Sequence, residues 1–310
     1  MPEPEYVWLP KPTLLTFEEL TRITSIFTGL GVRHVRLTGG EPLLRASVAD
    51  LTGRLAGLGI LDDLAMTTNG VLLAANAAAL KDAGLHRLTI SLDTLQRDRF
   101  VRLARYDEID RVMAGIAAAA PLFPGFKIDT VVIRGVNDDE MIALVEFGKT
   151  HGAEVRFIEY MDVGGATRWS WDNVVTRAQM LDQLAAHYGS VEPVGERSSA
   201  PADRFRLPDG TVFGIIASTT EPFCRNCDRS RLTADGMWYL CLYATRGTDL
   251  RAPLRSGANG EDLARLVAGT WQHRMDRGAE SRLALRDRSA MIPLSSLKRD
   301  PHLEMHTRGG

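Results

Sequence analysis

Short apolar runs alternate with longer amphipathic stretches through about the first 160 residues of the chain. The short runs are rich in β-branched and large apolar residues, a composition typical of strands. The longer stretches space their apolar residues three and four apart, as helices packed on a sheet do. This alternation predicts parallel βαβ units. The predicted strands cover residues 33–38, 64–68, 87–92, 127–133 and 154–159, and the predicted helices cover residues 16–30, 47–58, 72–83, 108–120 and 140–150.

Local signals mark the ends of several of these helices. Thr16 followed by Glu19 has the spacing of a capping box, in which side chains satisfy the first backbone N–H groups of a helix. Gly31, Gly84 and Gly152 follow predicted helices, where a glycine commonly ends the helix. We expect the apolar strands to be buried on both faces, as parallel strands usually are.

The rhythm changes after about residue 163. Gly164, Gly165, Trp169 and Trp171 precede a helix predicted over residues 178–188. Three hairpin-like strands follow over residues 190–196, 203–207 and 212–217, with a turn at residues 208–210. A last helix is expected over residues 260–277, and the arginine-rich remainder is expected to be irregular.

These elements predict an α/β chain with a barrel-type body and a C-terminal appendage that carries the cysteines. Five or six βα units are too few to close an eight-stranded barrel. We place the division near residue 163, so that residues 1–163 form the body and residues 164–310 complete the barrel and add the C-terminal domain. In barrels of this kind the functional residues lie at the carboxyl ends of the strands.

Composition excludes several classes of protein. The 310 residues are 45% hydrophobic and 25% charged with a net charge of −2, so no global field attracts nucleic acid. No apolar run approaches the roughly 18 residues of a membrane span. The first residues have neither the basic start nor the apolar core of a signal peptide. Three closely spaced cysteines suit a metal site in a reducing cytoplasm better than a disulfide framework.

The three cysteines, Cys224, Cys227 and Cys241, are the strongest chemical signal in the chain. A CxxC pair and a third thiolate across a turn leave a four-coordinate centre one ligand short, which is where a metal does chemistry. Either an iron–sulfur cluster or a structural zinc with a fourth ligand from elsewhere fits this spacing, and the cluster is favoured. Arg229 and Arg231 alternate after the pair, so an extended segment directs both guanidinium groups to one side, where they suit a triphosphate.

Polar motifs follow three of the predicted strands. Gly39 and Gly40 allow close backbone approach to a ligand and precede Glu41, which could take a positively charged amino group; Gly-Gly alone would be an ordinary turn. Residues 66–70 (Met-Thr-Thr-Asn-Gly) offer hydroxyls and an amide for a ribose or a base. Ser91 and Asp93 have two compatible interpretations, ligand contact and capping of the next helix.

Lys127 and Asp129 share one face of an otherwise apolar strand. A lysine on a buried face is costly unless it meets an anion. Paired with Asp129 it would be structural, whereas in a barrel mouth it would bind phosphate. Met161, just after the strand at residues 154–159, is by itself typical of core packing.

Taken in order, these motifs resemble the GTP 3′,8-cyclase family, the radical S-adenosylmethionine enzymes that open molybdenum cofactor biosynthesis. The similarity runs through residues 37–42, 67–70, 91–93, 130–138, 156–161 and 224–236, Cys241 and the Gly-Gly ending. Each motif is loose alone, but the ordered combination is specific. The resemblance implies an incomplete (β/α)6 TIM-type barrel with an α+β appendage that carries an iron–sulfur site.

The resemblance also implies roles for individual residues. S-adenosylmethionine would contact Gly40, Ser91 and Met161. GTP would contact Arg36, Thr67, Lys127, Arg229, Ser230 and Arg231. A C-terminal 4Fe-4S cluster, whose free iron takes the guanine, would be held by Cys224, Cys227 and Cys241. The groups counted as catalytic are Arg229, Arg231, Gly309 and Gly310, because the C-terminal tail of the family reaches into the active site.

The implied reaction starts at a second 4Fe-4S cluster, which cleaves S-adenosylmethionine to methionine and a 5′-deoxyadenosyl radical. That radical takes hydrogen from the ribose 3′ carbon of GTP, and the carbon radical attacks carbon 8 of the guanine to give 3′,8-cyclo-7,8-dihydro-GTP. The protein aligns the two nucleosides and excludes water. Expected partners are an electron donor and the downstream cyclic pyranopterin monophosphate synthase, and a homodimer is compatible with the family.

The sequence departs from the family at one important point. The second cluster needs a CxxxCxxC loop, and no cysteine precedes Cys224. The favoured explanation is that this chain begins just past that loop and the first barrel strand. A degenerate paralogue that binds GTP and one cluster without catalysis, or a loop borrowed from another chain, would also explain it. Another radical enzyme, such as a peptide maturase, is opposed by Arg229, Arg231 and the Gly-Gly ending. His34 replaces a basic residue, which predicts a weaker phosphate contact.

Overall fold

An eight-stranded sheet organises most of the molecule. The computed structural model describes residues 7–163, 169–195, 199–285 and 288–309. The strands pair in the order β1-β2-β3-β4-β5-β8-β7-β6. Strands β1 to β5 and β8 run parallel, whereas β7 and β6 are antiparallel. The bounds are β1 (His34–Leu37), β2 (Asp63–Thr68), β3 (Arg87–Ser91), β4 (Lys127–Val132), β5 (Glu154–Glu159), β6 (Glu192–Val194), β7 (Asp203–Arg206) and β8 (Val212–Ile216).

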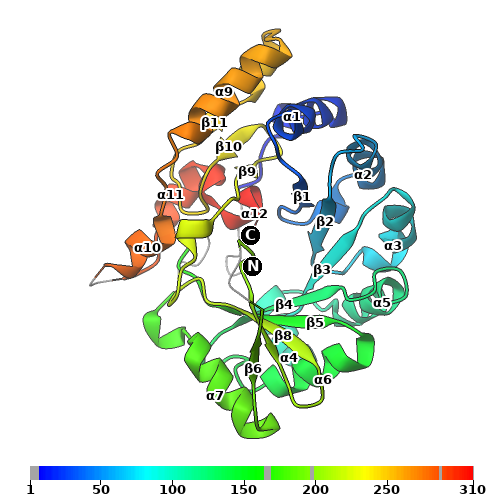
Figure 1. Ribbon diagram of the computed structural model, residues 1–310, viewed down its shortest axis with the longest axis vertical. Helices are drawn as coiled ribbons and strands as arrows, with labels where there is room; N and C mark the ends of the chain where they lie inside the picture. The colour runs from blue at the N-terminus through cyan, green and yellow to red at the C-terminus, as the bar shows by residue number, and fades with distance from the viewer. Residues whose placement is uncertain (1–6, 164–168, 196–198, 286–287, 310) are drawn as a thin grey trace.

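Helices cover the outer side of this curved sheet (Figure 1). They are α1 (Phe17–Gly29), α2 (Val48–Ala56), α3 (Leu73–Asp82), α4 (Arg97–Ala104), α5 (Ile109–Ala119), α6 (Met141–His151) and α7 (Arg177–Tyr188). The predicted capping box is confirmed, because Thr16 and Glu19 exchange backbone and side-chain hydrogen bonds at the start of α1. Helix α4 was not predicted, since half of its residues are charged and within it only Phe100 is buried.

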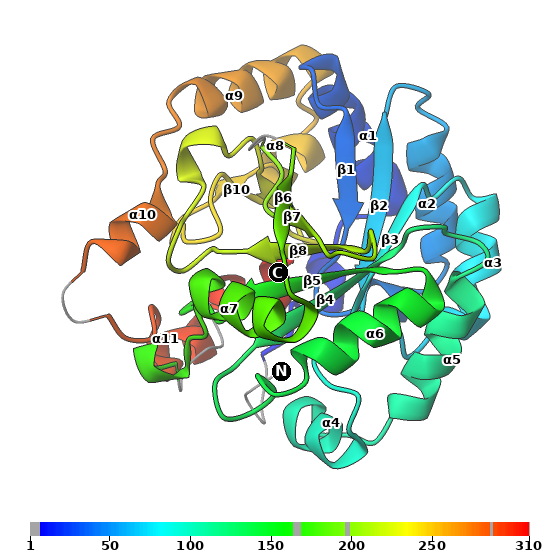
Figure 2. The ribbon, with the colours of Figure 1, turned by 60° about the horizontal axis from the view of Figure 1, so that its bottom comes forward.

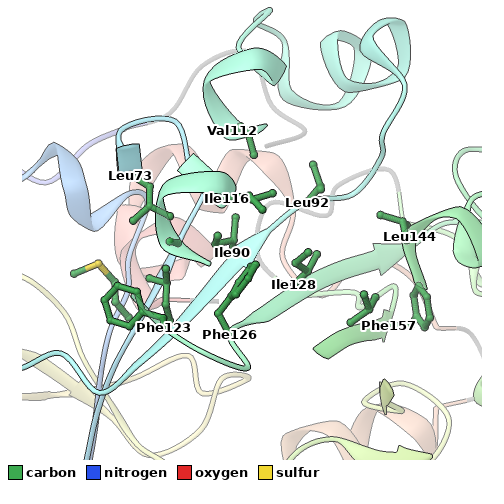
Figure 3. Close-up of a cluster of buried hydrophobic side chains, with 14 of the residues drawn as sticks. Leu73, Ile90, Leu92, Val112, Ile116, Phe123, Phe126, Ile128, Leu144 and Phe157 are labelled. Carbon is green, nitrogen blue, oxygen red and sulfur yellow. The ribbon is translucent and has the colours of Figure 1, made fainter. Parts of the chain in front are cut away.

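The main core lies between the sheet and these helices. Figure 3 shows Ile90 and Ile128 from the strands packed near Val112 and Ile116 of α5. These four side chains have no more than 1% of their surface exposed. Because successive residues of a strand point to opposite faces, the buried residues of β4 alternate with partly exposed ones. The helix-side face is therefore apolar and closely packed.

The inner face of the sheet is polar, which makes the expectation of strands buried on both faces wrong. Strand register places Thr67, Thr89, Lys127 and Glu154 side by side across four neighbouring strands. Arg36 is on the same face of the edge strand β1 and is exposed. Charged and hydroxyl side chains thus line the side of the sheet opposite helices α1 to α7.

The C-terminal third forms a second, smaller unit beside α1 (Figure 1). Its three-stranded antiparallel sheet has the order β11-β10-β9. Its elements are β9 (Arg231–Leu232), β10 (Met237–Tyr239), β11 (Thr248–Asp249), α8 (Arg251–Arg255), α9 (Gly260–Gln272), α10 (Gly278–Leu283), α11 (Leu294–Arg299) and α12 (Met305–Arg308). The last three helices correct the expectation of an irregular ending; each has six residues or fewer, too short to show a helical period.

The second unit is not independent of the first. Leu15 and Ile23, from the N-terminal region, share a buried cluster with Trp238, Leu250 and residues of α9. Helix α9 also packs directly on α1 at the top of Figure 1, and Figure 2 shows the same pair from another side. The two ends of the chain therefore build one common core.

Short 3-10 turns complete the described structure, at Lys11–Thr13, Pro42–Leu44, Trp171–Asn173, Cys224–Asn226 and Pro301–Leu303. Among the residues with assigned positions, no helix is long and apolar enough to cross a membrane.

Candidate functional site

The inner face of the sheet carries a guanidinium group that hydroxyls, rather than a carboxylate, hold in place. Arg36 Nη1 donates to Thr67 Oγ1 at 2.9 Å and to Thr89 Oγ1 at 3.1 Å. Hydroxyl groups orient the arginine without cancelling its charge. The structure thus brings together two of the residues predicted to contact GTP, Arg36 and Thr67, and leaves a net positive charge at that point.

Lys127 does not pair with Asp129, so the structural pairing considered from the sequence is wrong. Asp129 instead accepts both hydrogen bonds of a bidentate pair from Arg156, at 2.6 and 2.8 Å. Lys127 lies 3.5 Å from Glu154, whose other carboxylate oxygen contacts Arg204 at 2.8 Å. Burial, followed by the positive charge of Arg156, lowers the pKa of Lys127. Lys127 is thus only loosely neutralised and remains available to an anion.

Glu41 has a structural part to play in the turn after β1. Its carboxylate accepts hydrogen bonds from the Leu43 backbone, the Thr68 hydroxyl and the Asn69 backbone, at 3.0, 2.7 and 2.7 Å. Burial raises its pKa. The carboxylate joins the strand end of β1 to that of β2, which differs from the expected capture of an amino group.

Ser91 and Met161 lie at the carboxyl ends of two strands. Ser91 is the exposed last residue of β3, and the partly buried Met161 follows β5 by two residues. Neither Ser91 nor Asp93 caps the next helix, because α4 begins after Gln96, which makes no capping hydrogen bond. Asp93 instead accepts a hydrogen bond from the backbone of Val131 in β4. Helix capping is therefore ruled out as an explanation for this motif.

A buried carboxylate at the end of β5 fixes the segment that leads to the cysteines. Glu159 has no exposed surface and accepts hydrogen bonds from the backbones of Thr219 and Thr220, at 2.9 and 2.7 Å. The Thr220 hydroxyl and the Arg177 backbone also donate to it. Sequence reasoning missed this anchor, because nothing in the sequence shows that residues 60 positions apart meet.

The cysteine segment folds as a 3-10 turn followed by a hairpin. The turn spans Cys224–Asn226, and the hairpin pairs β9 with β10. Gly236 closes the predicted hairpin turn with φ of +94°, where a side chain would meet Arg251. Cys241 follows β10 by two residues. The hairpin thus reverses the chain direction between Cys227 and Cys241, and their joint use as metal ligands stays a prediction.

The surroundings of Cys227 favour a thiolate, whereas those of Cys224 do not. Burial raises the pKa of Cys224, although backbone N–H groups of Ala279 and Glu280 donate to its sulfur. Burial acts in the same sense on Cys227, but there a backbone hydrogen bond from Arg229, the charge of Arg229 and a hydrogen bond from Arg274 lower the pKa overall. Arg274 Nη2 lies 3.5 Å from the Cys227 sulfur. Hydrogen bonds and positive charge of this kind stabilise cluster-bound sulfur.

In the part of the chain that has assigned positions, no three His, Cys, Asp or Glu side chains are grouped closely enough to hold one metal ion. In a cubane cluster each thiolate binds a different iron, so its ligands stand further apart than those of one ion. The donor set, three cysteines with N–H and guanidinium donors beside them, fits such a cluster better than a zinc ion.

Arg229 and Arg231 carry buried nitrogens with unused donor capacity. Within the described residues, Arg229 Nη2 and Arg231 Nε have no hydrogen-bond partner. Burial, then the charge of Arg229, lowers the pKa of Arg231 to about 10. The Arg229 guanidinium lies 4.6 Å from the centre of the Phe223 ring. Unpaired buried donors are costly, so two of them beside three thiols indicate a site for an anion. The exposed Ser230 lies between them.

The C-terminal tail lies against the first strand-end motif. A methyl group on Gly309 would come within 2.3 Å of Thr38 Cγ2, and Gly309 has φ of +71°. One on Gly40 would come within 3.1 Å of the Trp8 ring and 3.6 Å of His306 Cβ. Only glycine fits at Gly309, and the tail reaches the loop that contains Gly40. Gly310 is outside the described residues.

A second buried carboxylate, also missed from the sequence, follows Met161 directly. Asp162 has no exposed surface and accepts hydrogen bonds from Arg282 at 2.8 Å, from Arg288 at 2.8 and 2.9 Å, and from the Tyr243 hydroxyl at 3.1 Å. Its partners lie 81 to 126 residues away in sequence, so no local pattern could reveal them.

Comparison with known proteins identifies the fold and the family of the chain. Residues 4–148 match the Radical SAM superfamily, and residues 153–280 match the Molybdenum Cofactor Synthesis C family. Streptococcus suis SuiB bound to S-adenosylmethionine has a similar fold, with a TM-score of 0.59 and 12% identity over 91% of this chain and 64% of that one. The chain thus has the α/β fold of radical S-adenosylmethionine proteins, with a mostly parallel sheet.

Curated relatives narrow the class to one family. GTP 3′,8-cyclase 1 of Mycobacterium tuberculosis (strain CDC 1551 / Oshkosh) is 56% identical over 315 aligned residues, which cover 100% of this chain and 88% of the relative. GTP 3′,8-cyclase of Aquifex aeolicus (strain VF5) is 39% identical over 100% of this chain and 91% of the relative. The chain belongs to the GTP 3′,8-cyclase family.

Proposed function

We propose that this protein binds GTP between the inner face of its sheet and the cysteine hairpin, as the substrate of a radical S-adenosylmethionine GTP 3′,8-cyclase in the first step of molybdenum cofactor synthesis. The observation that carries the proposal is a set of arginine side chains whose positive charge or donor groups are not fully paired with protein acceptors. Arg36 is held by hydroxyls, and Arg229 and Arg231 have buried, unused donors. A triphosphate supplies the anionic oxygens that such donors require.

In this proposal the chain positions two ligands. Arg36 and Lys127 bind the triphosphate from the sheet, Thr67 orients Arg36, and Arg229, Ser230 and Arg231 bind from the hairpin. Gly40, Ser91 and Met161, all near strand ends, contact S-adenosylmethionine. Gly309 and Gly310 complete the catalytic surface with Arg229 and Arg231. The main contribution of these residues is to orient two nucleosides and to exclude water from them.

The three cysteines, Cys224, Cys227 and Cys241, would hold a 4Fe-4S cluster. When bound, such a cluster supplies an iron with an open position, which can accept a nitrogen or oxygen of the guanine. The 310 residues contain no second set of three cysteines. Cluster-dependent cleavage of S-adenosylmethionine therefore has no ligand set on these residues.

The proposal also covers the architecture of the chain and its partners. The six parallel strands would form an incomplete (β/α)6 TIM-type barrel, with residues 1–163 as its main part and residues 164–310 as its remainder and the C-terminal domain. An electron donor and the synthase that forms cyclic pyranopterin monophosphate would be its partners in a reducing cytoplasm, which keeps the thiols free.

Anaerobic binding of GTP by calorimetry tests the proposal. Replacing Arg229 or Arg231 by alanine is expected to weaken GTP binding about ten- to hundredfold, since each removes charge-assisted hydrogen bonds to phosphate. Higher salt should narrow the difference, because it screens the charges. Arg225→Ala, on an exposed arginine of the same loop, is the matched control and should leave affinity unchanged. Equal affinity in all four proteins would refute the proposed phosphate site.

Iron and sulfide counting after anaerobic reconstitution tests the cluster separately. We expect about four irons per chain, as in one 4Fe-4S cluster, and a loss of most of this iron in Cys224→Ala. Two clusters on the 310 residues, or iron retained without Cys224, would contradict the assignment.

A further inference from the structure

The C-terminal helix α12 is held in place by hydrogen bonds from Arg308 and by the His306 ring, whose centroid lies 4.6 Å from that of the Trp8 ring. It has four residues, and the three that are buried are His306, Thr307 and Arg308. Arg308 has only 4% of its surface exposed. A helix this short has no stability of its own, because forming its first turn is unfavourable. The position of Gly309 against Thr38 therefore depends on what binds Arg308.

Arg308 joins the tail to the loop that follows Cys241. Its guanidinium Nη1 donates to the carbonyl oxygen of Leu242 at 3.0 Å and also to that of Ala244. Nε donates to the carbonyl oxygen of His302, and the guanidinium lies 4.3 Å from the centre of the Tyr239 ring. A planar group with several fixed donors can reach these acceptors at once, whereas a lysine cannot.

The same loop is tied to the barrel from its other side. The Tyr243 hydroxyl donates to Asp162, which is held by Arg282 and Arg288 and follows Met161. The Cys241–Ala244 segment thus lies between two attachments, Asp162 at the end of β5 and Arg308 in the tail. Movement of this loop is transmitted to both.

We propose that Arg308 is a positioning residue that couples the Cys241 loop to the C-terminal tail, so that Gly309 is seated at Thr38 and Gly39 only when that loop is ordered. The inference rests on the proposed function, in which Gly309 forms part of the catalytic surface. Use of Cys241 as a cluster ligand restricts the loop and, through Arg308, favours the seated tail. By reciprocity, a seated tail favours the liganded loop.

Release of the C-terminal residues by a carboxypeptidase, together with hydrogen exchange of residues 301–310, measures how often the tail opens. The reconstituted full-length chain is compared with Arg308→Met, which keeps an unbranched side chain without the donors. We expect the open fraction to rise about ten- to hundredfold, because hydrogen bonds from a charged group are lost. Arg308→Lys should give an intermediate value.

Arg299→Met is the matched control. Arg299 lies in the same C-terminal segment, is exposed, and donates to the Ser295 carbonyl oxygen one turn away. Replacing Arg299 should leave the open fraction of the tail unchanged. Tyr243→Phe provides an independent variant with intact Arg308: it removes the hydroxyl contact to Asp162 and should open the tail by a smaller factor.

Unchanged tail opening in both Arg308→Met and Tyr243→Phe would overturn the coupling. So would equal protection of the tail in wild-type protein with and without reconstituted iron. GTP binding is measured in parallel, because the two proposals fail differently. If wild-type protein does not bind GTP but its tail protection still depends on Arg308 and on iron, the proposed function is wrong and the coupling stands.

Discussion

Gly115 decides how closely α5 approaches the strand end that carries Thr67, and Gly115→Ala tests this with two opposing effects. Replacing a glycine inside a helix by alanine normally stabilises a protein by about 1 kcal/mol. At Gly115, however, the new methyl group would lie 2.4 Å from the carbonyl oxygen of Gly70 and 3.1 Å from Leu73 Cβ. The nearest atom is backbone, in the turn just after β2, so it cannot move aside as the end of a side chain can.

Overpacking a buried position costs about 1–3 kcal/mol, and more where backbone must shift. At 2.4 Å the contact lies far inside van der Waals distance, so the cost should be at the upper end and exceed the gain in helix propensity. We therefore expect Gly115→Ala to lower the free energy of unfolding by about 1–2 kcal/mol or more. The displaced turn should also weaken GTP binding through Thr67 and Arg36.

Urea unfolding followed by circular dichroism provides the measurement, with Gly269→Ala as the matched control. Gly269 is also inside a helix, α9, but a methyl group there meets nothing within 4 Å. This control should be stabilised by up to about 1 kcal/mol. If Gly115→Ala is as stable as Gly269→Ala, the close approach of α5 to the turn does not exist and the reasoning fails.

Three further predictions concern charged groups. Asp162→Asn should lower the free energy of unfolding by about 3–5 kcal/mol, because it removes a fully buried anion from two partly buried arginines. The exposed Asp110→Asn should change the free energy of unfolding little, and similar losses in both variants would contradict this account. Burial raises the pKa of Asp162, but Arg288 and Arg282 lower it further, so that the folded pKa lies below the ordinary value of 3.8. The stabilisation that Asp162 provides is therefore complete above pH 3.8 and is lost as the pH falls through the folded pKa. A hydrogen bond from Arg255 is the main reason why the pKa of Glu19 is lowered from 4.5 to about 2. Because solvent screens this pair, Glu19→Gln should lower the free energy of unfolding by only about 1 kcal/mol at pH 7. Urea unfolding should show this loss shrinking as the pH falls from 4.5 toward 2. The hydrogen bond to Asp235 raises the pKa of His302. The stabilisation that this pair provides is therefore complete below pH 6.5 and is lost as the pH rises through the raised pKa. Hydrogen exchange of the tail, corrected for intrinsic rates, should increase over that pH range in wild-type protein but not in His302→Gln.

Sequence periodicity was sufficient for the regular part of the fold. The five predicted strands of the first half and their helices are all present, since their apolar residues recur with the expected periods and several of the helices end near a glycine. The failures have a physical cause. Helix α4 has a single buried residue, and α10, α11 and α12 are too short to display a period. The pairing of β8 beside β5 was also missed, because strand order depends on contacts between distant residues.

The candidate site was predictable where motifs carry it and not where single buried charges do. The cysteine hairpin, its two arginines and the strand-end glycines are local patterns of a few residues. By contrast, Glu159, Asp162 and Arg308 look like ordinary charged residues, and their importance comes from partners tens of residues away. The polar inner face, by contrast, has a local sign in the sequence, because polar residues at alternate positions, such as Lys127 and Asp129 in β4, are typical of a strand with one polar and one apolar face.

The cluster that Leu15 and Ile23 share with Trp238 and Leu250 has a consequence for how the chain reaches its native state. Helix α1 leaves the ribosome well before the apolar surface that covers it, which is synthesised more than 200 residues later. Until then α1 exposes apolar side chains, and closing so large a loop is slow. The sheet can pack against its other helices before α1 is covered. We therefore expect the docking of the C-terminal unit to be the last folding step. Variants that slow this step should aggregate during synthesis even if the finished protein is stable.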